Sequence, residues 1–218
     1  MFYLVIVTCI WAFSFSLIGE YLAGSVDSFF AVVTHISIAA FVFLPYTKWR
    51  GFIPSFIYGV MLCGALQFGI TYVCLYIRFS LFSVPEVLLF TILTPLHITL
   101  IDDLLNRHFQ PWALISALIA TLGAAVIRYD AITSHFWYGF LILQLANFTF
   151  AAGQVYYKFL VKCYPSTIPL YRRWGYFYIG GLRIALPAFL LLGNTSTIHQ
   201  ITPLQWCILG WLGIGASA

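Results

Sequence analysis

The chain has 218 residues, of which 62% are hydrophobic and only 7% are charged, and its mean hydropathy is +0.97. Soluble domains carry about 25% charged residues, so this chain cannot cover a water-facing surface, and a soluble fold is excluded. The net charge of +4 does not indicate a nucleic-acid partner, because Lys and Arg lie in short loops and no basic patch is interleaved with aromatic residues.

Polar clusters interrupt the chain at intervals that suit membrane-spanning helices, each of which needs about 20 largely apolar residues. The spans that we predict, in chain order, cover residues 2–19, 29–46, 54–77, 84–101, 111–127, 136–157, 175–192 and 204–218. The apolar runs are continuous rather than alternating, which favours helices over the strands of a barrel. We therefore expect an all-α polytopic membrane protein with about eight helices, whose surroundings are the lipid bilayer.

The distribution of basic residues predicts the orientation. Loops after the second, fourth and sixth predicted helices hold Lys48, Arg50, Arg107, Lys158, Lys162, Arg172 and Arg173. Loops after the other predicted helices hold only Arg78 and Arg128. Cytoplasmic loops are enriched in Lys and Arg, so we expect the N-terminus in the cytoplasm.

An internal repeat is indicated by Phe-Ser-Phe at 13–15 in the first helix and Phe-Thr-Phe at 148–150 in the sixth. A repeat of five helices is odd-numbered, so its second copy must be inverted in the membrane, as in many secondary transporters. We expect a first repeat over 2–128 and an incomplete second repeat over 136–218, out of ten helices in all. The last apolar run is also too short for a ~30 Å hydrocarbon core, which suggests that the sequence is truncated inside its eighth helix.

Polar residues at membrane depth are the candidate site. In the third helix a small and polar stripe shares one face, at the spacing of helical turns: Gly59, Cys63, Gln67, Thr71, Cys74 and Arg78. Such a stripe faces protein or a watery cavity, with close helix packing as the alternative to a site. The sixth helix repeats the pattern with Gln144, Asn147, Ala151 and Gln154, whose amides suit a neutral ligand or each other. The first helix offers Trp11 and Ser14, although a lone Trp is also a common interfacial anchor.

The fourth helix combines a charge, a proline and a histidine. Pro95 removes a helical hydrogen bond, so we expect a kink there. Phe90 offers an aromatic wall, while Glu86 and His97 are candidates for proton coupling. For Glu86 we favour a capping box with Ser83 over a coupling role. Arg78 fits either a cavity mouth or a favourable position at a helix C-terminus.

No enzymatic pattern emerges. The sequence has no H-E-x-x-H pair, no G-x-S-x-G motif and no Gly-rich phosphate loop, so we expect no catalytic residues, no cofactor and no metal. The five cysteines form no C-x-x-C pair, and we interpret them as packing residues. A membrane enzyme that uses Asp102, Asp103 and His108 is the remaining catalytic alternative.

Three segments resemble the EamA branch of the drug/metabolite transporter superfamily: WAFSFSLIGEYLAG at 11–24, PEVLLFTILTPLHITLI at 85–101 and ALIATLGAAVIRYD at 117–130. That branch is built from two inverted five-helix repeats. More narrowly, GEYLAGSVDSFFAV at 19–32 and HFWYG at 135–139 resemble the biotin transporters of the bacterial inner membrane within the branch. The resemblance covers essentially the whole chain.

The resemblance implies uptake of biotin or a related carboxylate across the bacterial inner membrane. Such a ligand needs one cation, several amide or hydroxyl partners and aromatic walls. The residues that we expect to bind it are Arg78 for the carboxylate, Gln67, Thr71, Gln144 and Asn147 for the ureido edge, Trp11 and Phe90 as aromatic walls, and Ser14 as a further hydroxyl. The alternatives are transport or export of an amino acid or another metabolite, and a truncated fragment without transport activity.

Overall fold

The computed structural model describes residues 2–79, 84–107, 109, 111–127, 134–165 and 168–216, and its regular elements there are all helical. The α-helices are α1 (Phe2–Leu17), α2 (Ser28–Phe43), α3 (Pro54–Gly64), α4 (Thr71–Phe79), α5 (Val84–Thr91), α6 (Thr94–Asn106), α7 (Pro111–Ile127), α8 (Ser134–Cys163), α9 (Trp174–Leu192) and α10 (Pro203–Trp211). Three π-helical segments continue some of them: η1 (Ile18–Leu22) follows α1, η3 (Ala65–Ile70) joins α3 to α4, and η6 (Leu212–Ala216) follows α10. Short 3-10 segments are η2 (Leu44–Tyr46), η4 (Leu170–Arg172) and η5 (Thr195–Gln200).

The predicted helices are confirmed, with two differences. The fourth predicted helix is divided into α5 and α6 by a turn at residues 92–93, which is the expected effect of Pro95 at the start of α6. Helix α8 continues to Cys163, beyond the predicted end at 157. The boundary was wrong because Lys158 and Lys162 end the apolar run without ending the helical backbone, since Lys is a good helix former.

Four helical segments in the described part of the chain are long and apolar enough to cross a membrane. They cover Val5–Leu22, Ser28–Tyr46, Pro54–Phe79 and Trp174–Leu192. The chain is therefore a membrane protein with several spanning helices, as its composition predicts.

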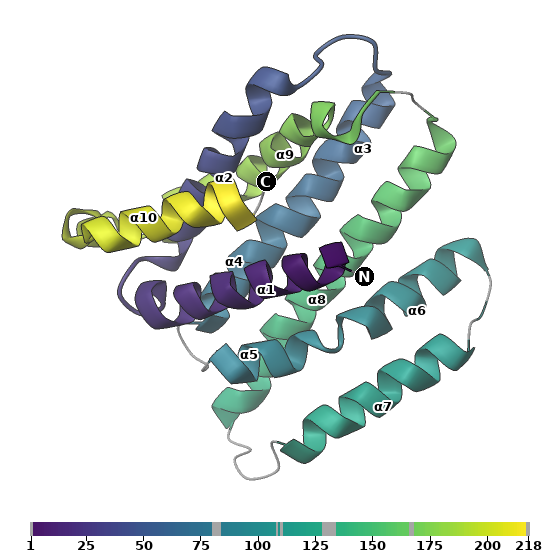
Figure 1. Cartoon of the computed structure of the whole chain (residues 1–218), viewed down its shortest axis with the longest axis horizontal. Helices are drawn as coiled ribbons and strands as arrows, with labels where there is room; N and C mark the ends of the chain where they lie inside the picture. Colours follow the sequence, from purple (N-terminus) through teal and green to yellow (C-terminus); the bar gives the residue numbers. More distant parts are fainter. Residues whose placement is uncertain are drawn as a thin grey trace.

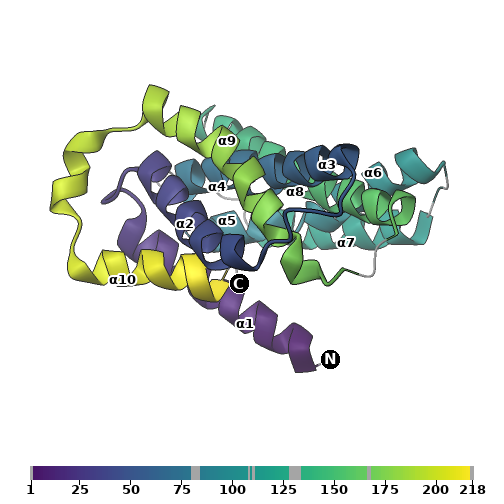
Figure 2. The same ribbon diagram turned by 90° about the horizontal axis from the view of Figure 1, so that it is seen from above.

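Helices α8 and α9 organise the packing (Figure 1). Helix α9 packs along α3 and η3 and against α2, while α8 packs against α3, η3, α4, α5 and α6. Helix α7 packs on α6 at one edge of the molecule (Figure 1). At the opposite side, α10 and η6 lie beside α1 and α2, and the first turns of α1 project away from the other helices (Figure 2).

Glycine residues allow α3 and α9 to approach closely. A Cβ atom on Gly64 would collide with the carbonyl oxygen of Phe177, and a Cβ atom on Gly180 would collide with the carbonyl oxygen of Met61. Gly59 packs in the same way on α8, where an added Cβ would lie 2.7 Å from Cδ1 of Leu160. Small residues have this role between membrane helices, because packing rather than hydrophobicity drives their association in lipid. Part of the polar stripe on the third predicted helix is therefore a packing surface.

Candidate functional site

A cavity of about 950 Å³, here called the large cavity, lies between α1, α2, α4, α5, α6, α7, α8 and η6. Small-molecule sites typically have volumes of about 300–1,000 Å³, so the space is sufficient for a metabolite. Its polar and aromatic lining residues include Thr8, Trp11, Ser14, His35, Thr71, Tyr72, Tyr76, Thr91, Thr94, Thr99, Ser116 and Asn147. Four residues expected from the sequence therefore meet in one cavity: Trp11, Ser14, Thr71 and Asn147.

Asn147 stabilises the break between α5 and α6. Its Nδ2 atom donates to the carbonyl oxygen of Phe90 at 2.9 Å, and its Oδ1 atom accepts from the Thr94 hydroxyl at 3.2 Å. Nδ2 also lies 3.3 Å from Oε1 of Gln144. A broken membrane helix requires such partners, because the backbone groups freed at the break otherwise lack hydrogen bonds. Asn147 therefore holds the cavity wall in shape through interhelical hydrogen bonds, whereas Gln144 contacts Asn147 within α8.

Thr71 joins α4 to α8. Its hydroxyl donates to the carbonyl oxygen of Leu66 at 2.8 Å, inside the π-helical segment η3. It also lies 2.9 Å from the Thr149 hydroxyl, which in turn bonds the Leu145 carbonyl at 2.9 Å. The proton of Thr71 is thus directed into the helix packing, and the oxygen is the atom that a ligand could approach.

Ser14 and Trp11 of α1 line the large cavity. Ser14 is buried and accepts a hydrogen bond at 3.2 Å from Nε1 of Trp211, which joins α1 to the end of α10. Trp11 remains 46% exposed, so its ring forms part of the cavity wall and part of the outer surface. That exposure is also compatible with the interfacial anchor considered from the sequence.

A histidine and two tyrosines of the large cavity were missed by sequence reasoning. His35 is buried, its Nδ1 atom lies 3.0 Å from the Tyr76 hydroxyl, and its ring centroid lies 4.9 Å from that of Tyr72. The imidazole also bonds the backbone carbonyl of Leu212 in η6. These contacts connect α2, α4 and η6. The available signal was an ionisable residue in the middle of a predicted span, which in itself indicates a site or a structural polar contact.

The remaining expected residues lie away from the large cavity. Arg78 is only 1% exposed, and its guanidinium carbon lies 5.5 Å from the centroid of the Tyr138 ring. Phe90 is buried against Phe140, with ring centroids 5.3 Å apart. His97 is half-buried, and its Nδ1 atom lies 2.9 Å from the Leu93 carbonyl at the helix break.

Glu86 lies half-buried in the first turn of α5. The capping box proposed for it involves Ser83, which is outside the described residues. The catalytic alternative also depends partly on such a position, because His108 is not described. Asp102 pairs with Lys158 at 3.0 Å and thereby joins α6 to α8. In the described part of the chain, no three His, Cys, Asp or Glu residues lie together as metal ligands.

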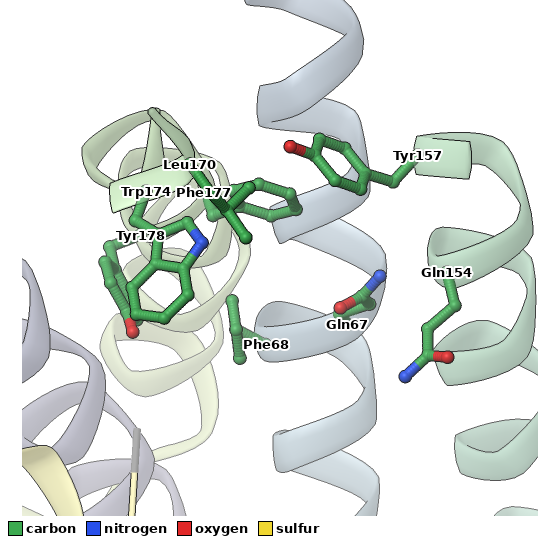
Figure 3. A pocket seen from close by; sticks show the side chains of 8 residues that line it. All are labelled: Gln67, Phe68, Gln154, Tyr157, Leu170, Trp174, Phe177 and Tyr178. Carbon is green, nitrogen blue, oxygen red and sulfur yellow. The ribbon is translucent and has the colours of Figure 1, made fainter. Parts of the chain in front are cut away.

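Gln67 faces a second, separate space of about 300 Å³, here called the aromatic pocket (Figure 3). Its lining residues are Gln67, Phe68, Gln154, Tyr157, Leu170, Trp174, Phe177 and Tyr178. They come from η3, α8, η4 and α9, and none of them lines the large cavity. The amide and hydroxyl residues expected to form one site are therefore divided between two spaces.

Comparison with known proteins gives a consistent result. The model of the EamA-like transporter family matches residues 1–129. The "Probable biotin transporter" of Pseudomonas aeruginosa is 62% identical over 218 residues, covering 100% of this chain and 76% of that protein. The "Biotin transporter" proteins of Salmonella typhimurium and Escherichia coli K12 are each 47% identical over 215 residues, covering 98% of this chain and 71% of those proteins.

Proposed function

The chain belongs to the EamA-like transporter family, and on that premise we propose that it carries biotin across the bacterial inner membrane, in the direction of uptake. The observation that carries this proposal is the 62% and 47% identity to proteins named as biotin transporters, extended over essentially the whole chain. The large cavity supports it, since the space lies among several helices and combines aromatic walls with hydroxyl and amide groups.

The proposed architecture is that of two inverted repeats, over 2–128 and 136–218, with a cytoplasmic N-terminus. Two features support it. The large cavity has residues of both segments in its wall, including Thr71 from the first and Asn147 from the second. The broken helix α5–α6 borders the cavity through Thr91 and Thr94, and discontinuous helices surround the substrate in several secondary transporters. Alternating access would then move one repeat relative to the other around this cavity.

Arg78 is proposed to receive the biotin carboxylate. Thr71 and Leu75 line the large cavity, and Arg78 is the next residue on that face of α4, three positions after Leu75. An Arg at this depth costs about 2.5–3.5 kcal/mol on insertion scales, which favours a functional reason for its presence. Movement of α8, whose Tyr138 ring lies against the guanidinium, would expose Arg78 to the cavity. Glu86 and His97 are the proposed candidates for proton coupling.

Uptake of radiolabelled biotin in a biotin-auxotrophic host that lacks its own transporter tests the proposal. Expression of the protein should restore uptake and growth on low biotin. Labelled amino acids supplied in the same assay test the alternative substrate class. Accumulation of an amino acid without biotin would overturn the biotin assignment, and the absence of both would overturn transport.

Two variants of Arg78 test its proposed role. Arg78→Ala should abolish saturable uptake at low biotin, whereas Arg78→Lys should retain part of it, because a point charge still attracts a carboxylate without bidentate hydrogen bonds. Biotin methyl ester, which lacks the carboxylate charge, should compete poorly with biotin in the wild-type protein. Unchanged uptake in Arg78→Ala would exclude the carboxylate role.

A further inference from the structure

The aromatic pocket lies one helical turn from the large cavity along two helices. Thr71 lines the large cavity and Gln67, four positions earlier, lines the aromatic pocket. Likewise Phe150 of α8 lines the large cavity and Gln154 lines the aromatic pocket. Four residues correspond to about 6 Å along a helix, so the two spaces are direct neighbours.

The direction from one space to the other is toward the predicted cytoplasmic side. Trp174, which lines the aromatic pocket, follows directly after Arg172 and Arg173 in one of the basic loops. Lys48 of another basic loop donates its backbone N–H to the carbonyl of Arg172 at 3.0 Å, so these two loops meet at this end of the molecule. The aromatic pocket therefore lies between the large cavity and the loops that the positive-inside rule places in the cytoplasm.

The aromatic walls of the pocket pack against one another and against Phe43, which lies outside the lining. The Trp174 ring lies 4.8 Å from the Phe43 ring, and Phe43 stacks on Tyr178 at 5.5 Å. Tyr178 also stacks on Phe68 at 5.2 Å. On the other wall, the rings of Tyr157 and Phe177 pack edge to face at 5.0 Å. A ligand would meet surfaces that are already in place, which reduces the entropy lost on binding.

Three polar groups in the lining of the aromatic pocket are available to a ligand. The side-chain amides of Gln67 and Gln154 and the indole N–H of Trp174 form no hydrogen bond with any residue in the described part of the chain. The Gln67 amide is held near α8 by Gly153, where an added Cβ would lie 2.5 Å from Cγ of Gln67. Figure 3 shows these side chains around one space, with the Trp174 nitrogen directed inward. Donors and acceptors are thus available to a ligand.

The lining residues also indicate which chemical class of ligand fits the aromatic pocket. No described residue of the lining is charged, so the pocket favours a neutral group over an anion or a cation. Two primary amides and an indole N–H present both donors and an acceptor, which match a flat ring that carries N–H and C=O groups on one edge. Aromatic faces on both sides suit the apolar surface of such a ring. A cyclic urea satisfies all three conditions.

We propose that the aromatic pocket is a second substrate station, which binds the ureido ring of biotin on the cytoplasmic side of the large cavity. The proposal rests on the proposed function only for the identity of the ligand. The π-helical segment η3 contains Gln67 and ends at Ile70, directly before Thr71, so it forms the boundary between the two stations. Such segments often occur at functional sites, because their extra residue changes the direction of side chains.

Binding is tested by titrating the purified protein with biotin and with 2-imidazolidinone, which is the bare cyclic urea, while tryptophan fluorescence is followed. Both compounds should change the signal of the wild type, and Trp174→Phe should lose the change that 2-imidazolidinone causes. Gln67→Met and Gln154→Met keep the side-chain volume but remove the amide, so each should weaken binding of 2-imidazolidinone roughly three- to tenfold. Gln200→Met, at an exposed amide of η5, is the matched control and should bind as the wild type does.

The outcomes separate the two proposals. Failure of the wild type to take up biotin would overturn the proposed function, while amide-dependent binding of 2-imidazolidinone would still support the pocket. If biotin is taken up, Gln154→Met should raise its KM by the same three- to tenfold factor. Unchanged affinity for 2-imidazolidinone in both Gln→Met variants, or a change of fluorescence by 2-imidazolidinone that persists in Trp174→Phe, would overturn the second station. Because Gln154 is exposed, its variant keeps the test valid even if Gln67→Met does not fold.

Discussion

Replacing Gly64 by alanine tests whether α3 and α9 pack backbone to backbone. The new methyl group would collide with the Phe177 carbonyl, which belongs to the backbone of α9 and cannot move as a side chain can. Overpacking costs about 1–3 kcal/mol, and this collision belongs at the upper end. The higher helix propensity of alanine offsets roughly 0.5–1 kcal/mol, which leaves a loss of about 2 kcal/mol. For a chain of this size, that corresponds to a Tm lower by roughly 4–8 °C.

The assay is the amount of monodisperse protein that remains in detergent after heating, measured by size-exclusion chromatography. Gly210→Ala in α10 is a matched control, because an added Cβ there has no neighbouring atom within 4 Å. Its Tm should be equal to that of the wild type or slightly higher. Equal melting of Gly64→Ala and Gly210→Ala would refute the close packing of α3 on α9.

Three further predictions concern polar contacts between helices. Asn147→Ala removes the amide that bonds both sides of the α5–α6 break. Interhelical hydrogen bonds are worth about 0.6–1.7 kcal/mol in membranes, so the Tm should fall by roughly 2–6 °C. An unchanged Tm would show that the break needs no hydrogen-bond partner. Trp211→Phe keeps an aromatic ring but removes the indole N–H that bonds Ser14, so it should lower the free energy of unfolding by about 1 kcal/mol or less. In the same assay its effect should not add to that of Ser14→Ala, and full additivity would contradict the contact. Lys158→Ala should change the Tm by less than about 4 °C, and only at low salt, because its pair with Asp102 is exposed on the lysine side; a larger effect that persists in 1 M NaCl would contradict this.

The sequence was sufficient for the helices because an apolar run of the right length has few other solutions in a bilayer. The kink at Pro95 also followed from local chemistry, since proline removes a backbone donor wherever it occurs in a helix. The end of α8 could not be predicted in this way, because hydropathy indicates where a helix leaves the apolar region rather than where the helical conformation ends. Lys158 and Lys162 illustrate this difference.

The candidate site was predicted only in part. Gln67 and Thr71 share a face of one helix, so sequence spacing placed them in one site, yet they line two different spaces. Tertiary packing decides which neighbouring helix covers each turn. The spacing of residues along one helix carries no information about that packing. His35 was missed for a related reason, since its partner Tyr76 lies 41 positions away in the sequence.

The central claim is transport of biotin, and counterflow in proteoliposomes measures it without regard to the energy source. Vesicles that contain the purified protein are loaded with unlabelled biotin and diluted into a trace of labelled biotin. The proposed function predicts a transient accumulation of label that exceeds that of protein-free vesicles and disappears when the internal biotin is omitted. Label that never exceeds the protein-free control would contradict biotin transport by this chain.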